Sequence, residues 1–374
     1  MVATDPEWSA YSASGPAPRE VLDEFESPGT GVAPSPECGI VGHAIKLGGK
    51  PLAEAFALLF AVAMRRGRVP VAWSTGFIKW LLKGKGDVLD PGAYHGVVLT
   101  SLVGKAFGRV RLKRLLRWLG AKSALPSLQT VPAGSTTSHL ALINEILALQ
   151  HGRRAAMYVM TVGTVKAYPP TSRLLLWRRL RELGLRGALL HLSTALFENA
   201  AHAGFAGGRY SGVIKRQTGV PEGFVLDPLL FAIAFSPVID TLWATGASVR
   251  ASGIWAGFFL LMDDVTPIAD SYYDLKALAV ALWEWYWRFR LEPYPGRPKT
   301  FVAVLGPGSK QEARAHGGVF SFEMSAQRAA QHVTGGAGAA LPGDIAAVIT
   351  IPIDDDIRVL GVRFSRLGGW TGFV

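Results

Sequence analysis

Two adjacent aspartates, Asp263 and Asp264, lie between two apolar segments, "GFFLLM" at 257–262 and "VTPIA" at 265–269. Carboxylate oxygens are hard ligands of the kind that Mg²⁺ prefers. A bound cation would offset the free energy that is needed to move two negative charges out of water. A solvated hairpin turn explains the same dipeptide without any ligand. The dipeptide alone therefore leaves both interpretations open.

Several other kinds of active site are excluded by the sequence. None of the three Gly-Lys pairs has the earlier glycine and the following Ser or Thr that a phosphate-binding loop requires. There is no Gly-x-Ser-x-Gly segment of the type that carries a nucleophilic serine. The eight histidines have no zinc-site spacing, and the single cysteine, Cys38, cannot form an internal disulfide. The acid pair is the candidate that remains.

The segments around the acid pair have the patterns of strands and helices. The two apolar runs predict a hairpin with Asp263 and Asp264 at its turn. The run "AAMYVMTVGTV" at 155–165 predicts a buried strand. The segment at 169–184 predicts a helix with Thr171 or Ser172 as N-cap and Gly184 just past its end. Strands and helices alternate without a repeating period, so the predicted fold class is α+β.

Further elements are predicted elsewhere. Strands are expected in 74–87, at the start of 96–120 and in 299–306, a hairpin at 346–364, and helices in the rest of 96–120 and at 53–66, 140–149, 228–245 and 275–290. The apolar run at 51–64 is interrupted by Glu54 and is shorter than a membrane span, so we expect a buried helix and no membrane partner. Residues 1–40 are rich in Pro, Ser, Gly and acid and predict a flexible tail.

The charge of the chain is positive but unevenly distributed. The formal net charge is +11, which favours an anionic partner such as nucleic acid. Two basic blocks carry most of the excess, one at 79–122 and one at 153–186, whereas residues 1–40 are acidic.

Seven segments, taken in order, have the form of one family's motifs. They are "RRGRVPVAWSTGFIKWLLKGKGDVLDPGAYHGVVLTS" (65–101), "LQTVPAGSTTSHLALINEI" (128–146), "VGTVKAYPPTSRLLLWRRLRELGL" (162–185), "TGVPEGFVLDPLLFAIAF" (218–235), "LLMDDVTPIADS" (260–271), "RPKTFVAV" (297–304) and "IRVLGVRF" (357–364). From about residue 45 to 370 the chain thereby resembles the reverse transcriptase domain of non-long-terminal-repeat retroelements. The resemblance implies a polymerase-type fold with fingers and a palm, whose antiparallel sheet is backed by helices.

The resemblance also implies a reaction and its residues. The family's reaction is template-directed DNA synthesis by two-metal nucleotidyl transfer, for which Mg²⁺ is the expected cofactor. Asp263 and Asp264 would be the catalytic, metal-binding pair. The basic blocks would follow the backbone of an RNA template and a DNA primer. The positions expected to contact nucleotide or template are Lys83, Lys85, His95, Lys166, Gly223 and Lys299.

The palm block departs from the family at its metal ligands. The triplet Lys166-Ala167-Tyr168 sets the register of this block. The family's metal-binding aspartate, three residues earlier, is Gly163 here, and its second aspartate is Pro169. No Asp or Glu occurs in residues 146–181 to replace them. A site without the carboxylate that bridges both metal ions should react slower by orders of magnitude.

Other family positions in the site have changed as well. The aromatic residue before the acid pair is Leu261, and the arginine of the fingers strand is His95. The family's Gln-Gly-Ser stretch reads Glu222-Gly223-Phe224, which places an acid and a bulky ring beside the expected nucleotide path. The positions that differ from the family thus belong to the expected active site more than to the hydrophobic core.

The sequence therefore supports a reverse transcriptase domain of retroelement origin whose activity is lost or very weak. The alternatives are a non-catalytic nucleic-acid-binding protein that uses the remaining basic groove, and a decayed reading frame without a role. The expected organisation is an acidic tail at 1–40, a fingers-like region at 41–150 and a palm-like region at 151–374 that ends at a primer-grip-like hairpin, as a fragment without a complete thumb. The N-terminus has no signal-peptide pattern and the chain has one cysteine, which predicts an intracellular location, nuclear or cytoplasmic. The oligomeric state stays open.

Overall fold

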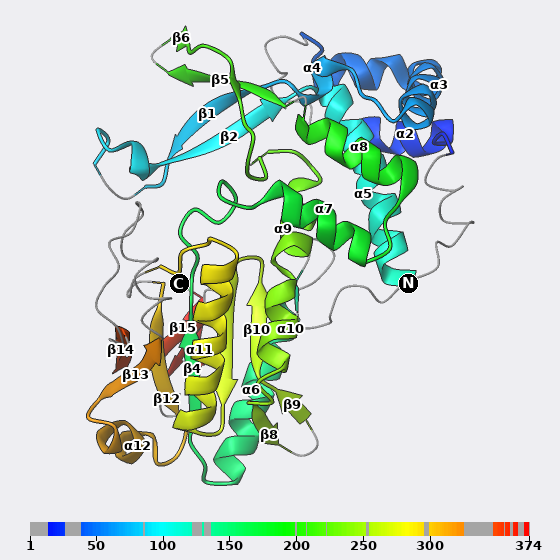
Figure 1. Cartoon of the computed structure of the whole chain (residues 1–374). Coiled ribbons are helices and arrows are strands. Elements are labelled where there is room, and N and C mark those ends of the chain that lie inside the picture. The colour runs from blue at the N-terminus through cyan, green and yellow to red at the C-terminus, as the bar shows by residue number, and fades with distance from the viewer. Residues whose placement is uncertain are drawn as a thin grey trace. The chain divides into compact units, whose positions relative to one another are not determined.

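The computed structural model describes residues 14–26, 39–84, 87–121, 129–130, 136–198, 200–206, 208–221, 223–251, 254–294, 299–324, 347–354, 356–359, 362–365 and 370–373 (Figure 1). The chain divides into two compact units. Unit 1 comprises Met1–Leu125 and Thr171–Ala234, and unit 2 comprises Pro126–Pro170 and Phe235–Val374. The mixture of helices and sheets confirms the predicted α+β class.

The units do not follow the expected boundary at residue 150. Residues 171–234 belong to unit 1, because strand β5 (Ala201–Ala206) pairs in parallel with β1 (Gly76–Leu82). Residues 126–150 belong to unit 2, because Ile143, Ile146 and Leu147 share a core with β4 (Met157–Thr161). The chain thus leaves unit 1 and returns to it, which local sequence patterns do not reveal.

Unit 1 combines a helical body with a five-stranded sheet. Its elements are α2 (Pro18–Glu26), α3 (Gly42–Arg66), α4 (Val71–Ser74), β1, the 3₁₀ helix Pro91–Ala93, β2 (Tyr94–Thr100), α5 (Leu102–Ala121), α7 (Arg173–Glu182), α8 (Gly187–Glu198), β5, β6 (Arg209–Tyr210), β7 (Ile214–Lys215) and α9 (Asp227–Phe235). The strand order is β2-β1-β5-β6, and β7 also pairs with β5. Strands β1 and β2 form an antiparallel hairpin from Gly76 opposite Thr100 to Leu82 opposite Tyr94.

Buried aromatic rings hold the helices of unit 1 together. Phe60 of α3 lies with its ring centroid 5.1 Å from that of Phe107 on α5 and 5.4 Å from that of Trp73 on α4. Phe25 of α2 is buried with them, in edge contact with Phe56. Such tilted and edge-on pairs stabilise by about 0.5–1.5 kcal/mol each beyond the area that they bury.

Part of the expected acidic tail is a docked helix. Residues 18–26 form α2, in which Val21 and Phe25 are buried, contrary to the prediction of a flexible tail. Glu24 is only 1% exposed, and its carboxylate pairs with Arg109 Nε at 2.7 Å and with Lys113 Nζ at 2.5 Å. Residues 1–13 and 27–38 lie outside the described residues.

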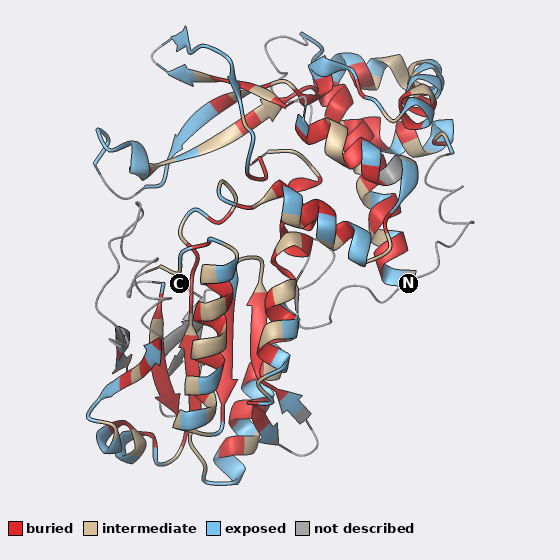
Figure 2. Cartoon of the chain, viewed as in Figure 1, coloured by how far each residue is buried: buried red, intermediate tan, exposed pale blue. Residues whose placement is uncertain are grey.

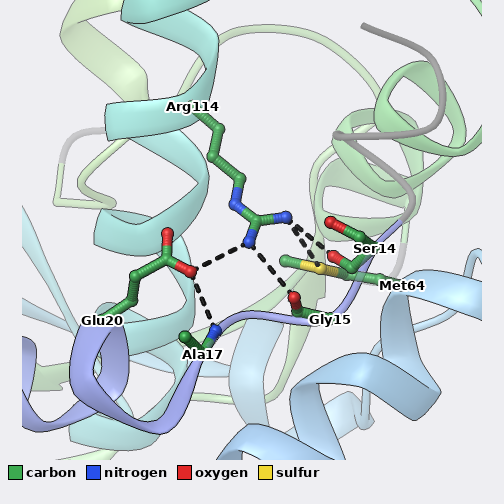
Figure 3. Close-up of polar contacts among 6 residues, drawn as sticks. All are labelled: Ser14, Gly15, Ala17, Glu20, Met64 and Arg114. Carbon is green, nitrogen blue, oxygen red and sulfur yellow. Dashed lines mark hydrogen bonds and ion pairs between the residues drawn. The ribbon is translucent and has the colours of Figure 1, made fainter. Parts of the chain in front are cut away.

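A second acid of α2 reaches a buried cation of α5 (Figure 3). The Arg114 side chain is 3% exposed, and its Nη2 lies 3.1 Å from Glu20 Oε2. The same guanidinium donates to the carbonyl oxygens of Ser14 and Gly15 at 2.7 and 3.3 Å. The basic side of α5 that we expected to follow a nucleic-acid backbone is therefore largely paired with acidic residues of the chain itself, because helix α2 covers it.

Helix α3 is the one described helix that is long and apolar enough to cross a membrane, with 25 residues and a mean hydropathy of 1.4 over its most apolar window. It begins 11 residues before the predicted helix start at 53, and a kink at Gly49, whose φ of 50° is not helical, separates this extra segment from the part that contains the expected apolar run. Phe60 and Met64 are buried against the protein, and Glu54 pairs with Lys50 on an exposed side of the helix. These core contacts account for one side of the helix, whereas Leu47, Leu58 and Leu59 are exposed, so the predicted burial holds for part of the apolar run only.

Unit 2 is built on a seven-stranded sheet. Its elements are β3 (Gln129–Thr130), α6 (Thr136–Gly152), β4, α10 (Pro237–Trp243), β8 (Val249–Ala251), β9 (Ile254–Ala256), β10 (Phe258–Leu261), β11 (Asp264–Ala269), α11 (Tyr272–Arg288), β12 (Phe301–Leu305), α12 (Ser309–Ala315), β13 (Val319–Met324), β14 (Ala347–Asp354), β15 (Asp356–Val359), β16 (Val362–Ser365) and β17 (Trp370–Phe373). The sheet order is β13-β14-β12-β4-β11-β10-β3.

Helices cover both faces of this sheet. Met157 and Val159 of β4 share a core with α6, whereas Tyr158, which points to the other face, contacts Tyr272 of α11. Burial on both faces explains why β4 reads as a continuous apolar run. Figure 2 shows β4, β10 and β12 buried along most of their length.

The edges of the sheet differ from expectation. The central strands β12, β4, β11 and β10 are antiparallel, but β12 pairs with β14 and β10 with β3 in parallel, so the sheet is mixed rather than antiparallel. The predicted hairpin at 346–364 is wrong. Strand β14 pairs with β12 and β13, and the hairpin consists of β15 and β16.

The predicted helix at 228–245 is two helices, α9 and α10. The second begins at Pro237, a residue without a backbone N–H.

Candidate functional site

The acid pair lies at the turn of a hairpin in unit 2, as predicted. Strands β10 and β11 are antiparallel, and Leu261 pairs with Asp264, so Met262 and Asp263 form a two-residue turn. Met262 has a φ of 55°, a left-handed conformation that glycine adopts more easily. A non-glycine residue in this conformation stores about 1–3 kcal/mol of strain, which the flanking strands hold in place.

Gly163 lies directly across from Asp264. Val162 forms a bridge with Val265 in which each backbone N–H donates to the other residue's carbonyl, at 2.8 and 3.0 Å. The next residue, Gly163, is therefore in register with Asp264, and both positions project from the same face of the sheet. The position at which the resemblance requires a carboxylate thus faces the acid pair and carries no side chain.

The surroundings of Gly163 leave little space for a side chain. An added Cβ would lie 2.9 Å from both Cβ and Cδ of Lys299. Two backbone hydrogen bonds also fix the position of Gly163. Its N–H donates to Lys299 O at 3.2 Å, and Tyr294 N–H donates to Gly163 O at 2.7 Å. A larger residue at position 163 would displace the flexible end of the Lys299 side chain and also its Cβ, which moves only with the Lys299 backbone.

Two buried polar side chains, Thr164 and Tyr286, form hydrogen bonds beneath the turn. Thr164 Oγ1 donates to the carbonyl of Asp263 at 3.0 Å and lies 2.8 Å from the hydroxyl of Tyr286. Since the threonine proton is used in the first bond, Tyr286 must donate the second. Burial, together with the nearby charges of Asp263 and Asp264, raises the pKa of Tyr286 well above its usual range, which keeps this donor protonated.

Its surroundings disfavour the negative charge of Asp264. Loss of solvation raises the pKa of Asp264, although part of its side chain is exposed, and the Lys299 ammonium acts in the opposite direction. Lys299 is itself exposed, with Nζ 6.0 Å from the centroid of the Tyr294 ring. The structure therefore brings Asp263, Asp264 and Lys299 together, three of the residues that the sequence indicated.

The donor set does not fit the two-metal arrangement that the resemblance implies. The residues that the structure describes include no group of three or more His, Cys, Asp or Glu side chains that could hold a metal ion. Both carboxylates come from one hairpin, and the neighbouring strand presents Gly163. A pair of ions must be held by oxygen ligands from more than one side, so no catalytic step through such ions follows from this geometry.

The remaining predicted residues lie apart from the hairpin in the sequence. Lys83 Nζ donates to Gly92 O at 2.8 Å and so closes its own loop. His95 is exposed on β2, and Lys166 is exposed in a turn with a φ of 44°. Lys85 and Glu222 lie outside the described residues.

Gly223 has a structural reason to be glycine. Its φ is 143°, and a Cβ there would lie 2.3 Å from the carbonyl oxygen of Val98 on β2. Close approach of the protein's own backbone thus accounts for this glycine, for which the resemblance implied contact with a nucleotide.

Two buried polar residues hold the segment around Gly223 in place, and this role was not assigned to them from the sequence. Asp227, which is 1% exposed, accepts hydrogen bonds at Oδ2 from the N–H groups of Gly223 and Phe224 at 3.2 and 2.7 Å. Arg173 is buried and donates to Gly219 O at 2.9 Å and to Phe197 O at 3.0 Å. An acidic residue in the first turn of a helix, from which a side chain can reach back to preceding N–H groups, is the one signal that could have indicated this role for Asp227.

The electrostatics of Asp264 predict that Asp264→Asn stabilises unit 2. Because the folded state penalises the charged form, the variant should gain free energy of unfolding at pH 7, by less than about 1 kcal/mol since the group is partly exposed. The raised pKa means that this penalty disappears as the pH falls below the usual aspartate pKa, so wild type and variant should converge near pH 3. Urea unfolding at both pH values measures this, and loss of stability in the variant at pH 7 would contradict it.

Comparisons with known proteins assign no family. No family model matches the chain, and no curated relative matches it. Among solved structures, the apo telomerase of Candida tropicalis, truncated from its C-terminal domain, is similar with a TM-score of 0.48 and 12% sequence identity. The similar region covers 86% of this chain and 60% of the telomerase chain. A likeness of this size leaves the function to be argued from the residues themselves.

Proposed function

We propose that this chain is a reverse-transcriptase-type domain of retroelement origin that binds nucleic acid and has lost template-directed DNA synthesis or retains it very weakly. The observation that carries the proposal is the register of Gly163 opposite Asp264. The seven motif segments in family order and the Asp263-Asp264 hairpin support the ancestry. The glycine across from the acids supports the loss of catalysis.

The chemical reason is the distribution of charge. Nucleotidyl transfer by two metal ions stabilises the attacking and the leaving oxygen, and the ions need carboxylates from both sides of the site. Here the hairpin supplies Asp263 and Asp264, while the strand beside it supplies a buried glycine. Electrostatic stabilisation is usually the largest catalytic contribution, so its loss is not offset by the remaining residues.

The sheet of unit 1 favours retained nucleic-acid binding. Phe77, Phe205 and Tyr210, which we name the aromatic face, contact one another with ring centroids 4.9 Å (Phe77–Tyr210) and 4.8 Å (Phe205–Tyr210) apart. Phe205 is 40% and Tyr210 55% exposed. By strand alternation, Lys79 and Lys215 project from the same face of the sheet. Proteins that bind single-stranded nucleic acid stack its bases on exposed aromatic rings and contact its phosphates with nearby cations.

This binding is tested with a labelled DNA primer on an RNA template that has a single-stranded overhang. We expect the logarithm of the affinity to fall linearly with the logarithm of the salt concentration, as phosphate neutralisation requires. Loss of a stacking ring costs about 1–3 kcal/mol per base, so Tyr210→Ala should weaken binding of the overhang about tenfold. Fluorescence anisotropy measures both effects.

The matched control is Tyr273→Ala, which removes a still more exposed tyrosine from α11 in unit 2. Its affinity for the overhang should equal that of the wild type. Absence of binding at low salt, absence of a salt slope, or equal losses in the two tyrosine variants would refute the proposed binding surface.

A further inference from the structure

A hollow of about 720 Å³ lies in unit 1 between the end of α3 and helix α8, and its lining includes no residue of the aromatic face. Its walls include Arg65, Arg66 and Arg68 on one side and His191 and Glu198 on the other. A volume of this size is typical of sites for small molecules. Neither the resemblance nor the proposed function uses these residues.

The end of α3 places the arginines at the rim. Gly67 adopts a φ of 63° and reverses the chain, and the N–H groups of Gly67 and Arg68 donate to Met64 O and Ala63 O, each at 3.3 Å. These bonds cap the helix without any arginine side chain. A Cβ on Gly67 would lie 3.6 Å from His191 Cβ, so the reversal packs against α8 and brings the arginines beside the imidazole.

The charge of the hollow is not balanced by the protein. Arg65, Arg66 and Arg68 are exposed, and none of them forms an ion pair within the part of the chain that the structure describes. Glu198 is the one acid among the lining residues. Neighbouring guanidinium groups repel one another, and a concave wall strengthens their combined electrostatic potential. An anion in the hollow would relieve this repulsion.

The side chains also indicate which anion. Guanidinium groups bind phosphate through paired N–H donors, and three of them exceed what one small carboxylate needs. Val71, which is largely exposed, adds an apolar surface to the same hollow. We propose that this hollow binds the phosphate groups of a nucleotide, which is either a free nucleoside triphosphate or part of a nucleic-acid strand. Phosphates contact the arginines, and the sugar or base contacts the apolar wall.

Equilibrium dialysis of the full chain with labelled ATP, with pyrophosphate as competitor, tests this site. We expect wild type to bind ATP, pyrophosphate to displace it, and the double variant Arg66→Glu/Arg68→Glu to lose at least tenfold in affinity. The control is Lys46→Glu/Lys50→Glu, which changes the net charge equally on the same helix outside the hollow and should lose less than twofold. Thermal unfolding of both variants verifies that they are folded.

The outcomes separate this site from other basic surfaces. Absence of ATP binding by the wild type, or equal losses in the two double variants, would overturn the proposal, because the arginines then act only through bulk charge or by complementing the carbonyl end of α3. A parallel titration with a short single-stranded oligonucleotide identifies the source of the phosphate. Loss of ATP binding alone assigns a free nucleotide, and loss of both ligands assigns the strand. The aromatic face is tested by oligonucleotide binding of Tyr210→Ala and this hollow by the pyrophosphate-sensitive ATP binding of the arginine variant, so failure of one and failure of the other are distinguishable.

Discussion

Gly163→Asp should create a divalent-metal site in unit 2 that the wild type lacks. The new carboxylate would project beside Asp264, at the Cβ separation of about 4.5–5.5 Å that paired strand residues have. Without metal, three neighbouring negative charges and the displaced Lys299 side chain should lower the stability of the variant below that of wild type, by about 1–3 kcal/mol. Mn²⁺ should reverse this loss, because a ligand that binds only the folded state stabilises it by about 2.7 kcal/mol at 100 times its dissociation constant.

The matched control is Gly163→Asn, which has nearly the same size and no charge. Thermal unfolding at increasing Mn²⁺ concentration should raise the Tm of the aspartate variant only. If the asparagine variant or the wild type gains as much from Mn²⁺, the ions bind elsewhere and the missing carboxylate is not the defect.

Loss of the cations around Glu24 should strongly destabilise unit 1. In Arg109→Ala/Lys113→Ala the Glu24 carboxylate stays buried without its partners, and a lone buried charge costs about 3–5 kcal/mol. Glu24→Gln should cost less, about 1–2 kcal/mol, because Arg109 and Lys113 are 24% and 58% exposed and remain solvated. Urea unfolding measures these differences.

Adding Glu24→Gln to the double variant should recover most of the loss, since it removes the charge that has become unpaired. A triple variant as unstable as the double variant would contradict this account, because the loss would then come from contacts of Arg109 and Lys113 other than those with the Glu24 carboxylate. This result also bears on nucleic-acid binding, because residues that hold α2 in place are not free to contact a phosphate backbone.

Features that depend on neighbouring residues were predictable from the sequence. The Asp263-Asp264 hairpin, the buried strand β4 and the helix that Ser172 caps follow the predicted positions, because alternation, apolar runs and capping residues act over a few positions. Ser172 accepts a hydrogen bond from Leu175 N–H, as an N-cap serine does.

Features that depend on distant partners were not predictable. The acidic composition of residues 18–26 indicated a tail, but Val21 and Phe25 have an apolar surface that packs in the folded chain, where α2 contacts α3 and α5. Strand β14 precedes a plausible turn at 354–356, yet pairs with β12 and β13 because the sheet offers those edges. The same applies at the candidate site. Gly163 was identified by its position in a motif, whereas its register against Asp264 needs the strand pairing.

Primer extension by the wild-type chain tests the loss of catalysis most directly. A labelled DNA primer on an RNA template is incubated with the four deoxynucleotides and either Mg²⁺ or Mn²⁺. We expect no more product than the Asp263→Asn/Asp264→Asn variant makes. Robust extension by the wild type that Asp263→Asn abolishes would show that the hairpin carboxylates hold working metal ions without a partner at position 163, and would contradict the proposed loss of catalysis.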